Sequence, residues 1–545
     1  MPASASSAVL ADYDLLESTL YRIPDGRFMC PGFVDTHCHA PQYSFSGTAT
    51  DKPLMSWLDE YTFPRESRHQ DLTLARTEYI KLVQRLLSNG TTTALYFASL
   101  HLEPTQLLAQ LLHQMGQRAY VGLVCMDRNS KDFYVKSLDQ NATDTETFIA
   151  TTRALGSSLV HPVVTPRFVP TCSPQLLARL GALAQRHGCH VQSHISESLD
   201  NDAFVAHLHP EVSGRDAALY DRAGLLTNRA VMAHGVMLTS AELALLAARG
   251  TAIAHCPLSN FFFADIPLDV LRCRELGVKV GLGTDVAGGY SPSMLNAMRS
   301  AVLAAKAVQM LRTDRARLAK RDRAPDGIMH EDAEQTRSRQ AGPSCNADAG
   351  NTGRAASGGE RGFTGNAQHM REDPEARPEI GSAQRDDSRA AHNAATLPYS
   401  ASTAFPDCEA SGAGLRDAET AGVDTSCATE CSNSGGATDC RRPELEGETG
   451  GISVDGLGTR GELDYRDAFW LATMGGAQAL GLEAKIGSFE VGKEFDALMI
   501  DAMGVSTFDT FTGDKPLDVF QKFINLGDDR NIRAVWVQGG LVLWK

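Results

Sequence analysis

The residues with the clearest chemistry stand at positions 35 to 39, which read Asp-Thr-His-Cys-His directly after an apolar Phe-Val pair. In an extended strand, side chains two positions apart point to the same side, so His37 and His39 can bind one ion together. A histidine pair alone is weak evidence for a metal, because two histidines near a strand end are often hydrogen-bonded surface groups. A metal site needs further ligands elsewhere in the chain.

Three further candidates each follow a short apolar run rich in β-branched residues: His194 in V-Q-S-H-I-S-E, His234 in V-M-A-H-G and Asp285 in G-L-G-T-D. The residues after each candidate are polar or glycine-rich, which is typical of a loop. Each candidate therefore stands at the end of a predicted strand. Imidazole nitrogens and a carboxylate suit Zn²⁺, and a catalytic zinc site keeps one position open for water.

Eight predicted strands alternate with helical segments in this part of the chain. The strands are predicted at Met29–Val34, Thr91–Phe97, Arg118–Met126, Val160–Phe168, His190–Ile195, Ala230–His234, Thr251–His255 and Lys279–Gly283. Helical periodicity is found at Leu72–Leu87, Thr105–Met115, Pro174–His187 and Ser240–Arg249. This alternation predicts an α/β fold, a parallel sheet closed into a (β/α)8 barrel of the TIM type, with its chemistry at the C-terminal strand ends.

Longer motifs surround the candidate residues. They are P-G-F-V-D-T-H-C-H-A-P-Q-Y-S-F from Pro31, Y-T-F-P-R-E from Tyr61, N-G-T-T-T-A from Asn89, V-T-P-R-F from Val164, S-H-I-S-E from Ser193, A-H-C-P-L-S-N from Ala254, G-L-G-T-D-V-A-G-G-Y-S from Gly281, G-S-F-E-V-G-K-E-F-D-A from Gly487 and L-G-D-D-R-N-I from Leu526. On these motifs the chain resembles the amidohydrolase superfamily of metal-dependent hydrolases and, within it, the enzymes that deaminate guanine.

The resemblance implies one Zn²⁺ per chain, with His37, His39, His194 and Asp285 as its ligands. A water molecule bound to such an ion has a pKa close to neutrality and can attack as hydroxide. The resemblance gives His234 a role in orienting this water and the tetrahedral intermediate. His234 and Asp285 are therefore expected to be catalytic residues.

Glu197 is the expected general acid/base, because it lies three residues past His194 and can reach a ring nitrogen of the substrate. Asp285 is expected to pass the proton of the water to the departing ammonia. A carboxylate that stabilises a helix N-terminus is the simpler alternative for Glu197.

The substrate-binding residues implied by the resemblance are Gln42, Arg167, Phe168 and Glu197. The amide of Gln42 can both donate and accept hydrogen bonds at a purine edge. Arg167 can donate to the O6 carbonyl, and Phe168 can stack on the ring. A surface ion pair is the alternative for Arg167, but the apolar residues that follow it argue against an exposed position.

The implied function is the zinc-dependent hydrolysis of guanine to xanthine and ammonia in purine catabolism, by a cytoplasmic homodimer. Two other functions stay open. The chain could deaminate another aminopurine, a pterin or a triazine, against which the Gln42 and Arg167 pair argues. It could also be a non-catalytic assembly protein of the same fold, although such relatives lose ligands that this chain keeps.

Composition gives further expectations. The net charge of −15 without a basic stripe argues against nucleic-acid partners. No apolar run is long enough for a membrane span, and no leader is recognised. Twelve cysteines without CxxC pairs indicate reduced thiols of a cytosolic protein. His255 could contact the site or make a core hydrogen bond, and no pattern ties the other histidines to the ligands: His101, His161, His187, His190, His207 and His209.

The chain also departs from the family it resembles. Residues 313–460 contain only three aromatic residues and are rich in small and charged ones, so we expect a disordered insertion, either a partner-binding loop or a tolerated one. Only 36 residues precede His37, which predicts an incomplete small β-domain and would follow from divergence or from a misplaced start codon. The triplet Phe261–Phe263 could narrow the pocket mouth or simply pack.

The expected domain organisation follows. Residues 1–29 are predicted as a partial N-terminal piece of a small β-sandwich domain, 30–312 as the barrel and 313–460 as the insertion. Residues 461–485 are predicted as the terminal barrel helix, and 486–545 as the C-terminal part of the β-domain, with a hairpin that turns at Gly539-Gly540.

Overall fold

The computed structural model describes residues 21–264, 266–321, 462–504 and 507–545. The predicted insertion lies outside these ranges from residue 322 to residue 460, so its predicted disorder stays a prediction. Helix α13, Met294–Arg321, continues beyond the predicted start of the insertion at Thr313. No helix in the described ranges is long and apolar enough to cross a membrane.

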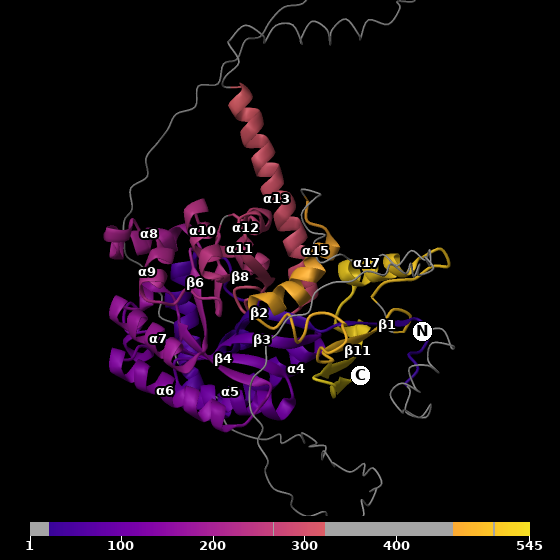
Figure 1. Cartoon of the computed structure of the whole chain (residues 1–545), viewed down its shortest axis with the longest axis horizontal. Helices are drawn as coiled ribbons and strands as arrows, with labels where there is room; N and C mark the ends of the chain where they lie inside the picture. The colour runs from indigo at the N-terminus through magenta and orange to yellow at the C-terminus, as the bar shows by residue number, and fades with distance from the viewer. Residues whose placement is uncertain (1–20, 265, 322–461, 505–506) are drawn as a thin grey trace, which may run out of the picture. The chain divides into compact units, whose positions relative to one another are not determined.

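Eight strands form one parallel sheet in chain order, which confirms the predicted barrel (Figure 1). The strands are β2 Phe33–His39, β3 Thr91–Phe97, β4 Arg118–Cys125, β5 Val160–Pro166, β6 His190–Ile195, β7 Ala230–His234, β8 Ala252–His255 and β9 Lys279–Leu282. Almost every strand residue is buried, as expected for a parallel sheet covered by helices. The ends of β2 and of β9 meet, because Asp285 donates its backbone N–H to the carbonyl of His37 at 2.9 Å.

One set of helices covers the outer face of the sheet (Figure 1). They are α4 Leu72–Ser88, α5 Leu102–Met115, α6 Leu138–Ala154, α7 Pro174–His187, α9 Asp216–Arg222, α10 Ser240–Arg249, α12 Val270–Glu275, α13 and α15 Tyr465–Trp470. Their ends follow local chemistry, and α7 is an example. The Ser173 side chain caps its start, Pro174 occupies the first turn, and Gly188 ends it in the left-handed conformation.

Other helical segments lie in the loops. They are η2 Ala40–Phe45, α2 Leu54–Trp57, η3 Leu58–Thr62, α3 Phe63–Ser67, η4 Arg68–Gln70, η5 Asp132–Tyr134, η6 Val169–Thr171, α8 Leu199–Leu208, η7 Pro210–Val212, α11 Pro257–Phe263, η8 Leu471–Gly475, α16 Gly476–Ala479, α17 Pro516–Leu526 and η9 Asp529–Asn531. Most of them follow the C-terminal ends of barrel strands, where loops carry function in this fold.

The first predicted strand, Met29–Val34, is wrong as one element, because two strands meet there. Strand β1, Arg27–Pro31, belongs to a second sheet, and β2 begins at Phe33 after Gly32. Gly32 lies so close to the Thr92 side chain that a Cβ atom at this position would stand 2.2 Å from Thr92 Oγ1. The alternation rule cannot separate two strands that share one apolar run.

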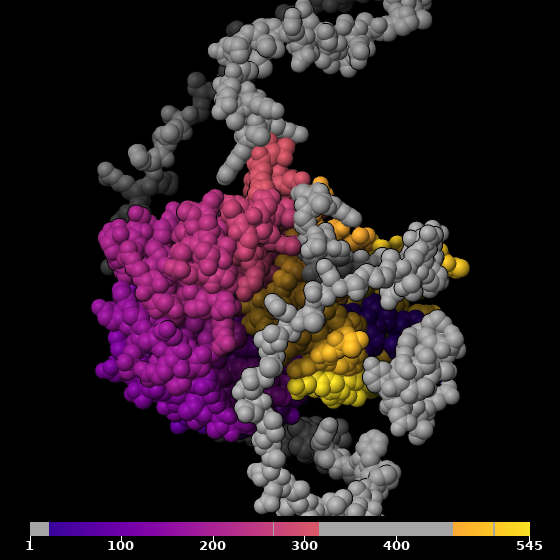
Figure 2. Space-filling model, viewed as in Figure 1, coloured from indigo at the N-terminus to yellow at the C-terminus, as the bar shows by residue number. Residues whose placement is uncertain are grey.

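The second sheet is antiparallel and has four strands in the order β1-β10-β11-β12. Its other strands are β10 Ala497–Asp501, β11 Ile532–Val537 and β12 Gly540–Trp544. It therefore joins strands from both sides of the barrel sequence, as predicted for the small β-domain, and Figure 2 shows the indigo N-terminal residues beside yellow C-terminal ones. The hairpin turn lies at Gln538-Gly539, one residue earlier than predicted, with positive φ at both residues.

The segment after α15 packs directly against the barrel strands. Ala477, Leu480 and Ile486 share an apolar cluster with strand residues such as Val34 and Val231. Gly476 permits this close approach, since a Cβ atom there would lie 2.7 Å from the Val34 Cβ atom. The barrel thus has a packed interior below its functional end.

Candidate active site

The predicted metal ligands meet at the C-terminal ends of their strands. His37 and His39 lie on β2, His194 lies on β6, and Asp285 follows β9. His39 Nε2 is 3.0 Å from His194 Nε2, and Asp285 Oδ1 is 3.0 Å from His37 Nε2 and 3.5 Å from His39 Nε2. The three histidines can offer their nitrogens to one ion. The structure therefore brings all four predicted ligands together.

The hydrogen bonds of these histidines fit a metal ion. His194 Nδ1 is 2.6 Å from the backbone carbonyl of Arg167, so Nδ1 carries the proton and Nε2 presents a lone pair. This lone pair faces His39 Nε2, and His37 Nε2 is buried without a hydrogen-bond partner among the described residues. Converging, unpaired ring nitrogens next to a carboxylate are the donor set that a zinc ion requires.

His234 and Glu197 stand beside this cluster. His234 ends β7, and its Nδ1 is 3.0 Å from Asn260 Oδ1, which leaves Nε2 directed at two carboxylates. His234 Nε2 is 3.4 Å from Glu197 Oε1 and 3.9 Å from Asp285 Oδ2. The three residues predicted as catalytic therefore form one group of side chains.

Burial sets the protonation of the cluster. It lowers the pKa of His37, His39 and His194 well below the ordinary range, so these rings are neutral, as metal ligands must be. Burial, reinforced by the negative charge of Asp285, raises the pKa of Glu197 well above the ordinary range. Burial also raises the pKa of Asp285, against the opposing effect of His234. Such shifts favour a carboxyl group that can hold and return a proton.

Two of these residues have unusual backbone conformations. His234 has a φ of +72° and Asp285 a φ of +48°, a region that residues other than glycine seldom adopt. Both lie where a buried strand turns into a loop. Positive φ at such positions is typical of functional centres.

The sequence interpretation missed Asp35, although it begins the Asp-Thr-His-Cys-His motif. Asp35 Oδ1 accepts hydrogen bonds from the backbone N–H groups of His37 and Thr284, at 3.1 and 3.0 Å, and Oδ2 accepts one from Thr284 Oγ1 at 2.5 Å. Burial raises the pKa of Asp35 to about 7, against these hydrogen bonds, which lower it. Asp35 thus joins β2 to the residue that precedes Asp285 and aligns two of the ligands.

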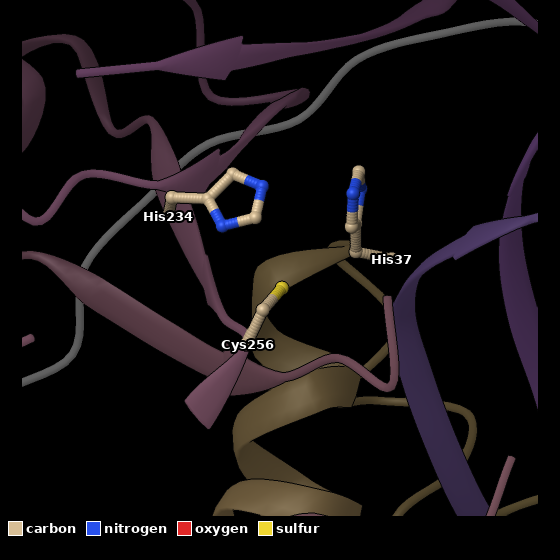
Figure 3. A group of neighbouring side chains, drawn as sticks. All are labelled: His37, His234 and Cys256. Atoms are coloured by element: carbon tan, nitrogen blue, oxygen red, sulfur yellow. The ribbon is translucent and has the colours of Figure 1, made fainter. Parts of the chain in front are cut away.

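Cys256, which follows β8, is a further residue near the cluster for which no role was predicted. Its side chain lies next to the rings of His37 and His234 (Figure 3). Burial raises the pKa of the thiol well above its usual range, and Sγ is 3.5 Å from the carbonyl of Ala254, to which it donates. Cys256 is therefore a protonated neighbour of the cluster, and the seven described cysteines are all free and buried.

The predicted substrate-binding residues line a cavity that opens on the ligand cluster. The cavity is narrow, with about 20 Å³ open to the centre of a water molecule. Its wall includes Gln42, Arg167, Phe168 and Glu197, together with His39, His194, Asp285, Leu54, Trp57, Leu58, Phe263 and Gly288. The lining combines apolar and aromatic side chains with polar ones, as sites for small heterocyclic ligands do.

Glu66, in the Y-T-F-P-R-E motif, is a second buried carboxylate that the sequence interpretation overlooked. Its side chain has no exposed surface and receives both terminal nitrogens of Arg167, at 2.5 and 3.0 Å. Gln42 Nε2 donates to Glu66 Oε1 at 2.7 Å, and Tyr134 donates to Oε2 at 3.0 Å. The alternative of a surface ion pair for Arg167 is therefore wrong, because the ion pair is buried.

The phenylalanine triplet divides between two roles. Phe263 is buried, lines the cavity and packs on Trp57 with ring centroids 5.0 Å apart. Phe261 and Phe262 are exposed. The triplet thus contributes one side chain to the cavity wall.

The other histidines that the structure describes belong to none of the groups that could hold a metal ion. His255 is buried, and neither of its ring nitrogens has a hydrogen-bond partner among the described residues. His190 Nε2 pairs with the carbonyl of Leu480, and His101 Nε2 with that of Ser67.

Known proteins resemble this chain over most of its length. The amidohydrolase family matches residues 28–320 and 416–542. The guanine deaminase of Dictyostelium discoideum is 32% identical over 517 residues, which are 95% of this chain and 82% of that protein. The guanine deaminase of Homo sapiens is 33% identical over 522 residues, with 95% and 83% covered.

A solved structure gives the same result. The guanine deaminase from C. acetobutylicum, crystallised with guanine bound in its active site, aligns with a TM-score of 0.63 and 26% identity, covering 95% of this chain and 87% of that one. The chain belongs to the amidohydrolase family, and within that family its similarity is to guanine deaminases.

Proposed function

We propose that this protein catalyses the zinc-dependent hydrolytic deamination of guanine to xanthine and ammonia. One observation carries the proposal: the cavity that is lined by Gln42 and Arg167 is also lined by His39, His194 and Asp285. A flat purine in this cavity would have its carbonyl edge near the polar pair and its amino-bearing carbon near the ligand cluster. The similarity to guanine deaminases supports the same substrate.

One zinc ion per chain would be held by His37, His39, His194 and Asp285. The chemistry that such an ion supplies when bound is the acidification of a water molecule, so that a nucleophile exists at neutral pH. The backbone carbonyl of Arg167 supports this site from outside, because it fixes the tautomer of His194.

Gln42 and Arg167 would orient the substrate. Arg167 can donate to a carbonyl oxygen, and the Gln42 amide can donate and accept at the neighbouring ring positions. Phe168 lines the same cavity and offers an aromatic face to the ring.

Proton transfer would fall to Glu197, His234 and Asp285. Glu197 holds a proton because burial raises its pKa, and it can deliver that proton to a ring nitrogen of the purine. Asp285 can accept one proton of the attacking water and return it to the leaving amino group, which departs as ammonia, while the second proton of the water returns to Glu197. His234 Nε2 lies near both carboxylates and would hold the attacking oxygen in place.

Two measurements on the purified protein test the proposal. Elemental analysis gives its bound metals, and activity assays compare guanine, adenine, a pterin and a triazine. We expect zinc near one equivalent per chain and xanthine from guanine alone. A chelator should abolish turnover and added zinc should restore it. Turnover of adenine as fast as guanine, or full activity without metal, would exclude the proposal.

The resemblance also leads us to propose that the protein is a cytoplasmic homodimer. Sedimentation equilibrium of the full chain tests the dimer, and imaging of a tagged chain tests the location. A monomer at micromolar concentration would contradict the first part of this proposal.

A further inference from the structure

We infer that Glu66 is a positioning residue of the substrate cavity that fixes both Gln42 and Arg167 and cancels the charge of Arg167. The cavity would therefore select an uncharged heterocycle with a carbonyl group and reject small anions. The substrate part of this inference rests on the proposed function, whereas the cancellation of charge can be tested without it.

The first argument is geometric. Glu66 lies on α3, in a loop region after β2, whereas Arg167 directly follows β5. The two terminal nitrogens of Arg167 donate to the two oxygens of Glu66. Such a bidentate ion pair fixes the orientation of the guanidinium group. Phe63, three residues before Glu66, packs against the flat face of the guanidinium group at 4.9 Å. One short helix thus holds Arg167 by its edge and by its face.

The second argument concerns the amide of Gln42. Its nitrogen donates to Glu66, and its oxygen accepts a hydrogen bond from the backbone N–H of Ala287 at 3.0 Å. With both ends of the amide bound, its orientation is fixed. One N–H group and one lone pair stay available for a ligand. Glu66 therefore determines which atom of Gln42 donates and which accepts.

The third argument concerns charge. The side chains of Glu66 and Arg167 are at most 3% exposed, so water screens neither of them. A buried guanidinium without its carboxylate would present a full positive charge to the cavity and attract anions. With Glu66 in place, Arg167 offers donors without net charge, which suits a neutral carbonyl oxygen. Arg167 also contacts the ligand cluster through its backbone, so its placement influences both parts of the site.

Two substitutions separate position from charge. Glu66→Asp keeps the charge but shortens the side chain, so it cannot reach Gln42, Arg167 and Tyr134 together. Glu66→Gln keeps the length but removes the charge. The matched control is Glu146→Gln, which removes the acid from the exposed ion pair with Arg186. Glu146 lies on the outer helix α6 and does not line the cavity.

We expect Glu66→Asp to raise KM for guanine about tenfold or more, with a smaller change in kcat and unchanged zinc content. Glu66→Gln should raise KM similarly. In addition, sodium nitrate should become a competitive inhibitor of Glu66→Gln and should raise its melting temperature, compared with sodium chloride at equal ionic strength. Neither salt should distinguish the unaltered protein, Glu66→Asp or Glu146→Gln.

If Glu66→Gln does not fold, the double variant Glu66→Gln/Arg167→Gln should recover the folded state, because it leaves no unpaired buried charge. A KM within twofold of the original for both single variants, or a folded Glu66→Gln that nitrate does not affect, would overturn the inference. If the unaltered protein fails to deaminate guanine, the proposed function fails, and the nitrate melting shift still decides whether Glu66 cancels the charge.

Discussion

Strand β6 carries two histidines that point to the same face but behave differently. His190 begins the strand, and His194 lies four residues later, near its C-terminal end. Both rings are buried or half-buried, and burial lowers the pKa of both. Their neighbours differ. The ring of His194 contacts those of His37, His39 and His234, and Glu197 and Asp285 line the same cavity. The ring of His190 instead packs edge-to-face on Tyr120, with ring centroids 4.7 Å apart.

The cavity beside each histidine shows what the difference means. The one at His190 is lined by Arg153, Arg229 and His161, and among the described residues no aspartate or glutamate lines it. The one at His194 is lined by Glu197 and Asp285. A neutral imidazole becomes a metal ligand where carboxylates and unpaired nitrogens converge with it. His190 has a carbonyl partner and an aromatic neighbour, but no carboxylate lines its cavity, which fits a structural role.

The largest expected effect is the contrast between alanine substitutions of His194 and His190. His194→Ala should lose zinc and at least about 10³-fold in kcat, because one imidazole ligand is removed. His190→Ala should keep zinc and activity and lose about 1–3 kcal/mol of stability, because the carbonyl of Leu480 loses its donor. Elemental analysis, turnover and unfolding of both variants measure the contrast. Equal zinc content in the two variants would contradict it.

The second effect separates proton transfer from metal binding at the C-terminal ends of the barrel strands. Glu197→Gln keeps the shape of the side chain but cannot transfer a proton, so it should retain zinc while kcat falls about 10²-fold or more. Zinc content and steady-state kinetics are the measurements. A parallel loss of zinc would instead give Glu197 a structural role.

A third and smaller effect concerns the proposed substrate cavity. Arg167→Ala removes charged donors, which should lower kcat/KM for guanine about 10–100-fold. It also leaves the buried charge of Glu66 without a cationic partner, so the variant should lose about 3–5 kcal/mol of stability. Guanine kinetics and chemical denaturation test both expectations. An unchanged kcat/KM would remove Arg167 from the substrate site.

The barrel and the ligands at its strand ends could be predicted from the sequence, whereas some residues that support the site could not. Residues followed by loops at strand ends, such as His194, could be identified because parallel strands bring their C-terminal ends together. Glu66 could not, since its partner Arg167 is 101 positions away and the pairing depends on how the loop after β2 folds back. Asp35 was hidden for a related reason, because only closure of the barrel between β2 and β9 brings Thr284 to it.

The smallest effect returns to His190 and is a dependence on pH. Burial lowers its folded-state pKa to about 4, whereas an exposed histidine has a pKa near 6.5. As pH falls below about 6.5, the unfolded chain takes up a proton that the folded chain refuses, so the contribution of His190 to stability is present above that pH. It is lost progressively down to about pH 4 and amounts to about 3 kcal/mol.

His190→Gln can still donate to the carbonyl of Leu480 but cannot titrate. Between pH 7 and pH 4.5 the unaltered protein should therefore lose more unfolding free energy than this variant. Urea titrations of both proteins at both pH values measure the difference. Loss of zinc at low pH affects both proteins equally and cancels in the difference. A difference that stays constant across this range would show that water reaches His190 and that burial does not set its pKa.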